Sequence, residues 1–189
     1  MPRVLLENQM ESYNTSVISC NMIVFDASTL ILIAKIEVLS GFLESVGFQV
    51  CVPGEVAKES CAIKRSLDAL LIRKSLDESK IRVVAVRDRK LVTKLRRDFG
   101  LGMGEAEAIA LAHFEKAALI GIDDKNGINA CKLLGVPFTT AIGILIRMHE
   151  KELLTTEHAL LKLTQLGQHG RYKRSILEDA KRRLEAEDD

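Results

Sequence analysis

Short, continuous apolar runs alternate along the chain with longer segments whose apolar residues recur at helical spacing. Continuous apolar runs of four to six residues are typical of strands buried on both faces of a parallel sheet. The runs predict strands at 22–25, 48–52, 81–86, 118–122 and 136–139. The other segments predict helices at about 30–36, 38–46, 53–59, 63–76, 88–99, 105–114, 127–134, 142–150, 157–166 and 172–186.

Strands that alternate with helices imply right-handed βαβ units. We therefore expect an α/β protein, a three-layer α/β/α arrangement with a central, mostly parallel sheet of about five strands. The chain divides into an N-terminal extension (1–21), a domain (22–155) and a C-terminal helical extension (156–189) that packs on the domain. Such sheets bind ligands at the carboxyl ends of their strands, so functional residues are expected just after the strands.

Composition narrows the class of protein. The 189 residues suit a single core, and with 47% hydrophobic but only 4% aromatic residues that core must be aliphatic. The net charge of +1 gives no chain-wide indication of nucleic-acid or membrane binding. The chain shows no signal peptide, no membrane-spanning run and no CxxC pair, which predicts a cytoplasmic protein with reduced thiols.

Acidic residues are concentrated where the predicted topology brings strand ends together. The positions are Asp26, Glu59, Glu105, Glu107, Asp123 and Asp124. Carboxylates packed together repel each other and raise each other's pKa unless a cation neutralises them. Mg²⁺ and Mn²⁺ prefer oxygen ligands, whereas a zinc site would be expected to include His or Cys. The pattern therefore predicts a magnesium or manganese site at one edge of the sheet.

Each acid also has a simpler structural explanation. Asp26 lies between a strand and a helix, where turn residues and N-caps are common, and Asp123 or Asp124 could begin a helix. The acids that open helix 105–114 interact favourably with the helix dipole wherever they occur. Glu59 could be an ordinary surface residue. The coincidence of several acids at one sheet edge favours the metal site over these separate explanations.

Four segments carry motifs in a specific order and spacing. They are Val24–Ile31 (a strand followed by D-x-S-x-L), Val52–Glu59 (P-x-x-V-x-x-E), Gly104–Ala112 (G-E-A-E-A-I) and Ile122–Lys125 with the residues after it. Together they resemble the motifs of PIN-domain ribonucleases, and the third has the form of one prokaryotic branch. The resemblance extends over about Met22–Leu154.

The resemblance implies a metal-dependent endoribonuclease that cleaves single-stranded or structured RNA. It further implies a toxin of a toxin–antitoxin pair, with an antitoxin protein and a second copy of the chain as partners. The catalytic acids would be Asp26, Glu59, Glu105 and Asp123, and the ligands of Mg²⁺ or Mn²⁺ would be Asp26, Glu105, Asp123 and Asp124. Ser28, Glu107 and Thr140 would act just outside the ligand set.

Two positions stay open within this resemblance. Glu105 matches the G-E pattern, whereas Glu107 better fits the spacing to the next strand. Residues two apart point to different helix faces and should not share one role, and we favour Glu105. At the last motif Asp123 stands where many family members have Thr or Ser, so Asp123 and Asp124 are both candidates.

The segment 80–97 is the most basic in the chain. Arg87, Lys90, Lys94 and Arg97 recur at helical spacing and would form a cationic stripe that could follow an RNA phosphate backbone. A solvated helix face explains the same pattern equally well. The tail 171–189 mixes charges of both signs, which indicates a surface or dimer-packing helix.

Competing functions fit less well. Phosphatases of the haloacid dehalogenase type need D-x-D after the first strand, and Ser28 stands at the second position. No P-loop and no dinucleotide-binding fingerprint occur. A non-catalytic module that acts through a protein or RNA partner is the remaining alternative, although every acidic motif position is occupied.

Overall fold

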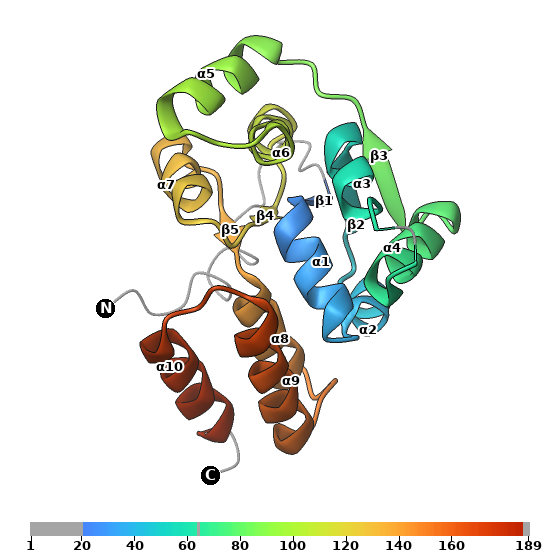
Figure 1. Cartoon of the computed structure of the whole chain (residues 1–189), viewed down its shortest axis with the longest axis vertical. Helices are drawn as coiled ribbons and strands as arrows, with labels where there is room; N and C mark the ends of the chain where they lie inside the picture. Colours follow the sequence, from blue (N-terminus) through green and yellow to red (C-terminus); the bar gives the residue numbers. More distant parts are fainter. Residues whose placement is uncertain (1–20, 64, 187–189) are drawn as a thin grey trace, which may run out of the picture.

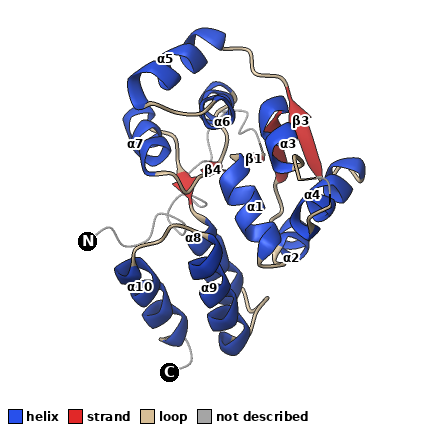
Figure 2. Ribbon diagram, viewed as in Figure 1, coloured by secondary structure: helices blue, strands red, loops and turns tan. Residues whose placement is uncertain are grey.

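The computed structural model of the protein describes residues 21–63 and 65–186. Its centre is a sheet of five parallel strands in the order β3-β2-β1-β4-β5 (Figures 1 and 2). The strands are β1 (Met22–Phe25), β2 (Gln49–Pro53), β3 (Ile81–Val84), β4 (Leu119–Gly121) and β5 (Phe138–Thr139). The predicted α/β class and three-layer arrangement are confirmed.

Helices connect the strands and cover both faces of the sheet. They are α1 (Ala27–Lys35), α2 (Leu39–Ser45), α3 (Gly54–Ser60), α4 (Leu67–Asp77), α5 (Arg89–Phe99), α6 (Met103–Phe114), α7 (Lys125–Leu134), α8 (Ala141–Glu150), α9 (Thr156–His169) and α10 (Arg174–Glu185). Right-handed crossovers place α1–α4 on one face and α5–α7 on the other (Figure 1).

The core is aliphatic, as the composition predicts. Val24 and Phe25 of β1 and Ile120 of β4 have no exposed surface. Helix α6 lies against β1, β2 and β4 and buries four alanines, at 106, 108, 110 and 112. Because alanine side chains are small, this helix can approach the sheet closely, which carries its acidic first turn to the sheet edge.

Two predicted helix starts are wrong by three residues or more. Helix α1 begins at Ala27 rather than near Leu30, because Asp26 is its N-cap. The helix expected from Ile63 begins at Leu67, after turn and bend residues at 61–63 and 65–66. In both cases local turn geometry sets the start, and apolar spacing alone does not reveal it.

The C-terminal part of the chain packs beside the sheet domain. Helix α8 contacts α1, α9 contacts α8, and α10 contacts both α8 and α9 (Figure 1). Helix α10 begins at Arg174, two residues later than predicted, so Tyr172 lies in the segment that precedes it. The division of the chain at residue 155 stays a prediction.

The N-terminal extension predicted for residues 1–21 lies outside the described residues except for Asn21. Within the described ranges, no helix is both long and apolar enough to cross a membrane.

Candidate metal centre

The carboxyl ends of three strands lie side by side. Phe25 of β1 is in register with Gly121 of β4, and Gly121 is in register with Thr139 of β5. The Asp26 N–H continues the ladder by donating to the Gly121 carbonyl at 3.0 Å. From β1 the chain builds the sheet toward β2 and β3, and it then crosses back to add β4 and β5 on the other side of β1. The carboxyl ends of β1 and β4 therefore form the switch point, which is where parallel sheets bind ligands.

Asp26 is fully buried at this point. Its Oδ1 accepts the Thr29 N–H at 2.8 Å as the N-cap of α1, and its Oδ2 accepts the Ser28 hydroxyl at 2.6 Å. Burial raises the pKa of Asp26 to about 7, hydrogen bonds from Ser28 and Thr29 oppose the rise, and nearby Asp123 adds to it. Among the described residues no cationic side chain pairs with this carboxylate. Its ionised form therefore lacks the counter-charge that a bound cation would supply.

Asp123 is half-buried and held by three donors. Its Oδ2 accepts the Thr29 hydroxyl at 2.8 Å and the Ala141 N–H at 3.0 Å, and its Oδ1 accepts the Tyr172 hydroxyl at 2.6 Å. Thr29 is thus bound to both acids, through its N–H to Asp26 and through its hydroxyl to Asp123. Burial, and then the Asp123 charge, raise the pKa of Tyr172, which keeps this hydroxyl a donor.

Asp124 has a different environment. Its Oδ1 accepts the N–H groups of Asn126 at 2.8 Å and Gly127 at 3.0 Å, as the N-cap of α7. The simpler explanation, helix initiation, therefore applies to Asp124. Of the two neighbouring acids, Asp123 is the one that Thr29 connects to Asp26.

The remaining acids gather around Gly104, in the first turn of α6. A Cβ placed on Gly104 would lie 2.5 Å from the Glu59 Oε2, so glycine lets the end of α3 approach α6 closely. Glu59 is exposed, yet its pKa is raised, first by partial desolvation and then by the nearby charge of Glu55. The charges of Glu105 and Glu107 add to the rise, and a hydrogen bond from the Gly104 N–H opposes it. The structure thus brings Glu59 into the acidic surroundings of α6.

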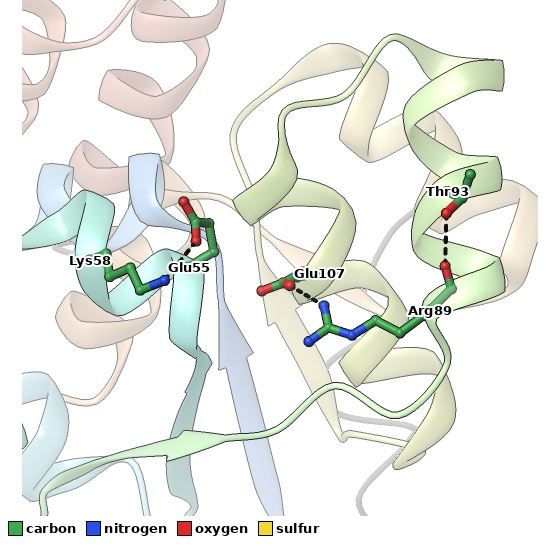
Figure 3. Close-up of polar contacts among 5 residues, drawn as sticks. All are labelled: Glu55, Lys58, Arg89, Thr93 and Glu107. Atoms are coloured by element: carbon green, nitrogen blue, oxygen red, sulfur yellow. Dashed lines mark hydrogen bonds and ion pairs between the residues drawn. The ribbon is translucent and has the colours of Figure 1, made fainter.

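Glu105 and Glu107 point to different partners, as their spacing predicts. Glu105 is half-buried and accepts the Gly102 N–H at 2.9 Å. Glu107 is buried and forms an ion pair with Arg89, whose side chain extends from the start of α5 toward α6 (Figure 3). Glu105 lines the same groove as Asp123, whereas Glu107 does not line it.

That groove has a volume of about 1030 Å³, and Ser28, Glu105, Asp123, Asp124 and Thr140 all line it. Thr140 caps α8 by accepting the Gly143 N–H at 3.1 Å, so its hydroxyl serves the helix rather than an acid. Ser28, in contrast, donates directly to Asp26.

The donor chemistry fits a hard divalent cation. Every candidate side chain offers carboxylate or hydroxyl oxygens, and Asp26 and Asp123 share one bridging residue. Within the part of the chain that the structure describes, no three His, Cys, Asp or Glu side chains already stand at metal-binding distances. Asp123 and Glu105 line one groove, and Thr29 connects Asp123 to the buried Asp26.

Sequence reasoning missed two residues of this site. Thr29 lies three residues after Asp26, so the N-cap pattern could have identified its N–H but not its hydroxyl contact. Tyr172 is 49 residues from Asp123 in the chain, and nothing in its local sequence indicates the contact.

The predicted cationic stripe lies on the surface of α5 and of the segment just before it. Arg87, Lys90, Lys94 and Arg97 are all exposed, and none of them lines the groove beside Asp123. Arg97 pairs with Asp98 at 2.7 Å, and the Arg87 guanidinium lies 5.9 Å from the Phe114 ring centre.

A family model described as a PIN domain matches residues 22–186, so the chain belongs to a PIN-domain family. PIN domains are generally nucleases and typically use divalent metals, which makes this chain a nuclease-type hydrolase with a nucleic-acid substrate. No curated protein matches the chain.

Proposed function

We propose that the protein is an endoribonuclease that depends on Mg²⁺ or Mn²⁺ and cleaves single-stranded or structured RNA. The observation that carries the proposal is the fully buried Asp26 carboxylate, which lies at the switch point of a PIN-domain sheet with no cationic partner among the described residues. Two acids joined by one threonine at that point form the beginning of an oxygen ligand set.

The residues of the site have separate tasks in this proposal. Asp26 and Asp123 hold the cation, and Glu105 and Asp124 complete its surroundings from the groove. Thr29 and Ser28 fix the orientation of the carboxylates by donating hydrogen bonds to them. A bound divalent cation would neutralise phosphate charge and make water a better nucleophile. Glu59, beside Gly104, would be a further catalytic acid at the rim.

Cleavage of a labelled single-stranded RNA tests the function directly. We expect the wild type to cleave with Mn²⁺ and to be inactive in EDTA, with activity returning when excess Mn²⁺ is added. Asp26→Asn, carried through the same purification, should be inactive in Mn²⁺. Equal cleavage by both proteins would identify a contaminating nuclease and remove the support for this site.

The choice between the two acids of α6 is also testable. We expect Glu105→Gln to lower kcat by about 10²-fold, because Glu105 lines the groove beside Asp123. Glu107→Gln should lower kcat much less, since Arg89 already engages that carboxylate. Single-turnover cleavage at saturating Mn²⁺ measures both, and the reverse ranking would assign the third acid to Glu107.

A toxin role, an antitoxin partner, a homodimer and a cytoplasmic location stay part of this proposal. Ile63, Leu67 and Leu70 are exposed apolar side chains in and before α4, and they would suit a protein partner. Light scattering would show whether the chain dimerises. The α5 stripe is proposed as an outer RNA contact because Lys90 and Lys94 are exposed.

A non-catalytic PIN-like module is the second candidate. Here Asp26 would act only as the N-cap of α1. Such a protein would show neither Mn²⁺-dependent thermal stabilisation nor cleavage, so a thermal melt with and without Mn²⁺ distinguishes the two candidates.

A further inference from the structure

The groove beside Asp123 has a wall that the sheet domain does not supply. Helices α1, α7 and α8 line it on one side, and the C-terminal segment 169–183 lines it on the other. Within the described residues, its lining carries more cations than acids. The cations are Lys35, Lys125, Lys132, Arg171, Lys173 and Arg183.

Most of these cations have no acidic partner. All six are exposed. Among the described residues, Arg183 is the one of the six that forms an ion pair, with a guanidinium nitrogen 3.8 Å from a carboxylate oxygen of Glu150. The other cations of α10 do not line the groove and are paired instead: Arg174 with Glu178, Lys181 with Glu185 and Arg182 with the groove-lining Asp179. The groove therefore offers positive charge that is available to an external anion.

Tyr172 fixes the C-terminal wall to the candidate metal centre. Its hydroxyl donates to Asp123 at 2.6 Å, and its ring packs so closely on Gly170 that a Cβ at that position would clash with it. Arg171 and Lys173 flank Tyr172 in the chain, and both line the groove. The contact thus anchors the backbone that carries Arg171 and Lys173 beside the acid.

We propose that this groove binds the phosphate backbone of single-stranded RNA, with the C-terminal segment 171–183 as an essential wall. The inference rests on the nuclease function proposed above, and it adds the path by which substrate reaches Asp123. Lys and Arg side chains that contact phosphates supply most of the affinity in such complexes. Apolar side chains such as Ile128 and Ile176 also line the groove and offer contact to bases without sequence readout.

A binding measurement in EDTA separates this inference from catalysis. Full-length wild type is titrated against a short, fluorescently labelled single-stranded RNA, and anisotropy is followed at several salt concentrations. The groove variant is Lys125→Gln/Arg171→Gln/Lys173→Gln. The matched control is Lys74→Gln/Arg174→Gln/Lys181→Gln, which removes the same charge from exposed, ion-paired positions outside the groove lining. Thermal melts confirm that all three proteins are folded.

We expect the groove variant to bind RNA at least tenfold more weakly than the wild type. The slope of its log binding constant against log salt concentration should be shallower by about two, as for the loss of three phosphate contacts. The control variant should stay within about twofold of the wild type, since its cations are already neutralised by partners. Equal weakening in both variants would mean that the effect of charge is non-specific. Unchanged binding by the groove variant would mean that the groove binds something other than RNA, such as an acidic protein segment. Either result overturns the inference.

The two proposals can fail separately. If the wild type cleaves RNA with Mn²⁺ while the groove variant binds RNA normally, the RNA path is wrong and the nuclease function stands. If the wild type neither binds nor cleaves RNA, both proposals are overturned.

Discussion

Asp26→Asn should make the metal-free protein more stable at pH 8 while abolishing RNA cleavage. The pKa of Asp26 rises from 3.8 to about 7 on folding, chiefly through burial. Asparagine keeps the shape, still accepts the Thr29 N–H and carries no charge to bury. A shift of this size corresponds to roughly 4 kcal/mol of unfolding free energy at high pH. The site would thus be maintained at a cost to stability.

The sign of the pH dependence follows from which state binds more protons. Between pH 3.8 and about 7 the folded protein holds a proton on Asp26 that the unfolded chain has released. The free energy of unfolding contributed by this group therefore falls as pH rises through that window, and it levels off above about 7. Below pH 3.8 both states are protonated and the penalty disappears.

Denaturation in EDTA at pH 5 and pH 8 measures this effect. We expect the gap between Asp26→Asn and the wild type to widen markedly at pH 8, and Mn²⁺ to raise the melting temperature of the wild type but not of Asp26→Asn. Asp88→Asn is the control, because Asp88 is also an N-cap and accepts the Leu91 N–H at 2.9 Å. A gap that stays constant with pH would show that Asp26 does not titrate in this window.

The sheet and the meeting of the strand-end acids could be predicted from sequence. The apolar runs before Asp26 and Asp123 identify buried parallel strands, and parallel strands present their carboxyl ends at one edge. Because β1 and β4 are neighbours, Asp26 and Asp123 come together regardless of which side chains surround them. For Asp26 the structure confirms the N-cap: the Thr29 N–H binds Oδ1, while the Ser28 hydroxyl binds Oδ2.

The details that depend on side-chain direction could not be predicted in the same way. Two acids at 105 and 107 look alike in sequence, and only the packing of α5 against α6 shows that Arg89 meets Glu107. Tyr172 was expected inside a helix, where it would have been one more surface residue. Its contact with Asp123 depends on where α9 ends and α10 begins, which long-range packing decides.

Thr29→Val should lower kcat by about 10²-fold, because small displacements of a catalytic group have effects of this size. The substitution keeps the volume and β-branching of a residue with no exposed surface, and it leaves the N–H that caps Asp26 intact. It removes the hydroxyl that binds Asp123 Oδ2 at 2.8 Å. Asp123 would then lose its connection to α1, and the separation of the two acids would no longer be fixed.

The conservative variant distinguishes positioning from general destabilisation. Losing one hydrogen bond to a charged group should cost about 1.5–3 kcal/mol of stability in Thr29→Val, which a urea titration measures. Thr29→Ser keeps the hydroxyl but loses a buried methyl, so it should also lose stability while retaining most of the activity. Higher Mn²⁺ should partly restore kcat in Thr29→Val, since the weakened ligand pair would need more metal to fill. If both variants lost activity in proportion to stability, Thr29 would have only a structural role, and the connection between Asp26 and Asp123 would contribute nothing to catalysis.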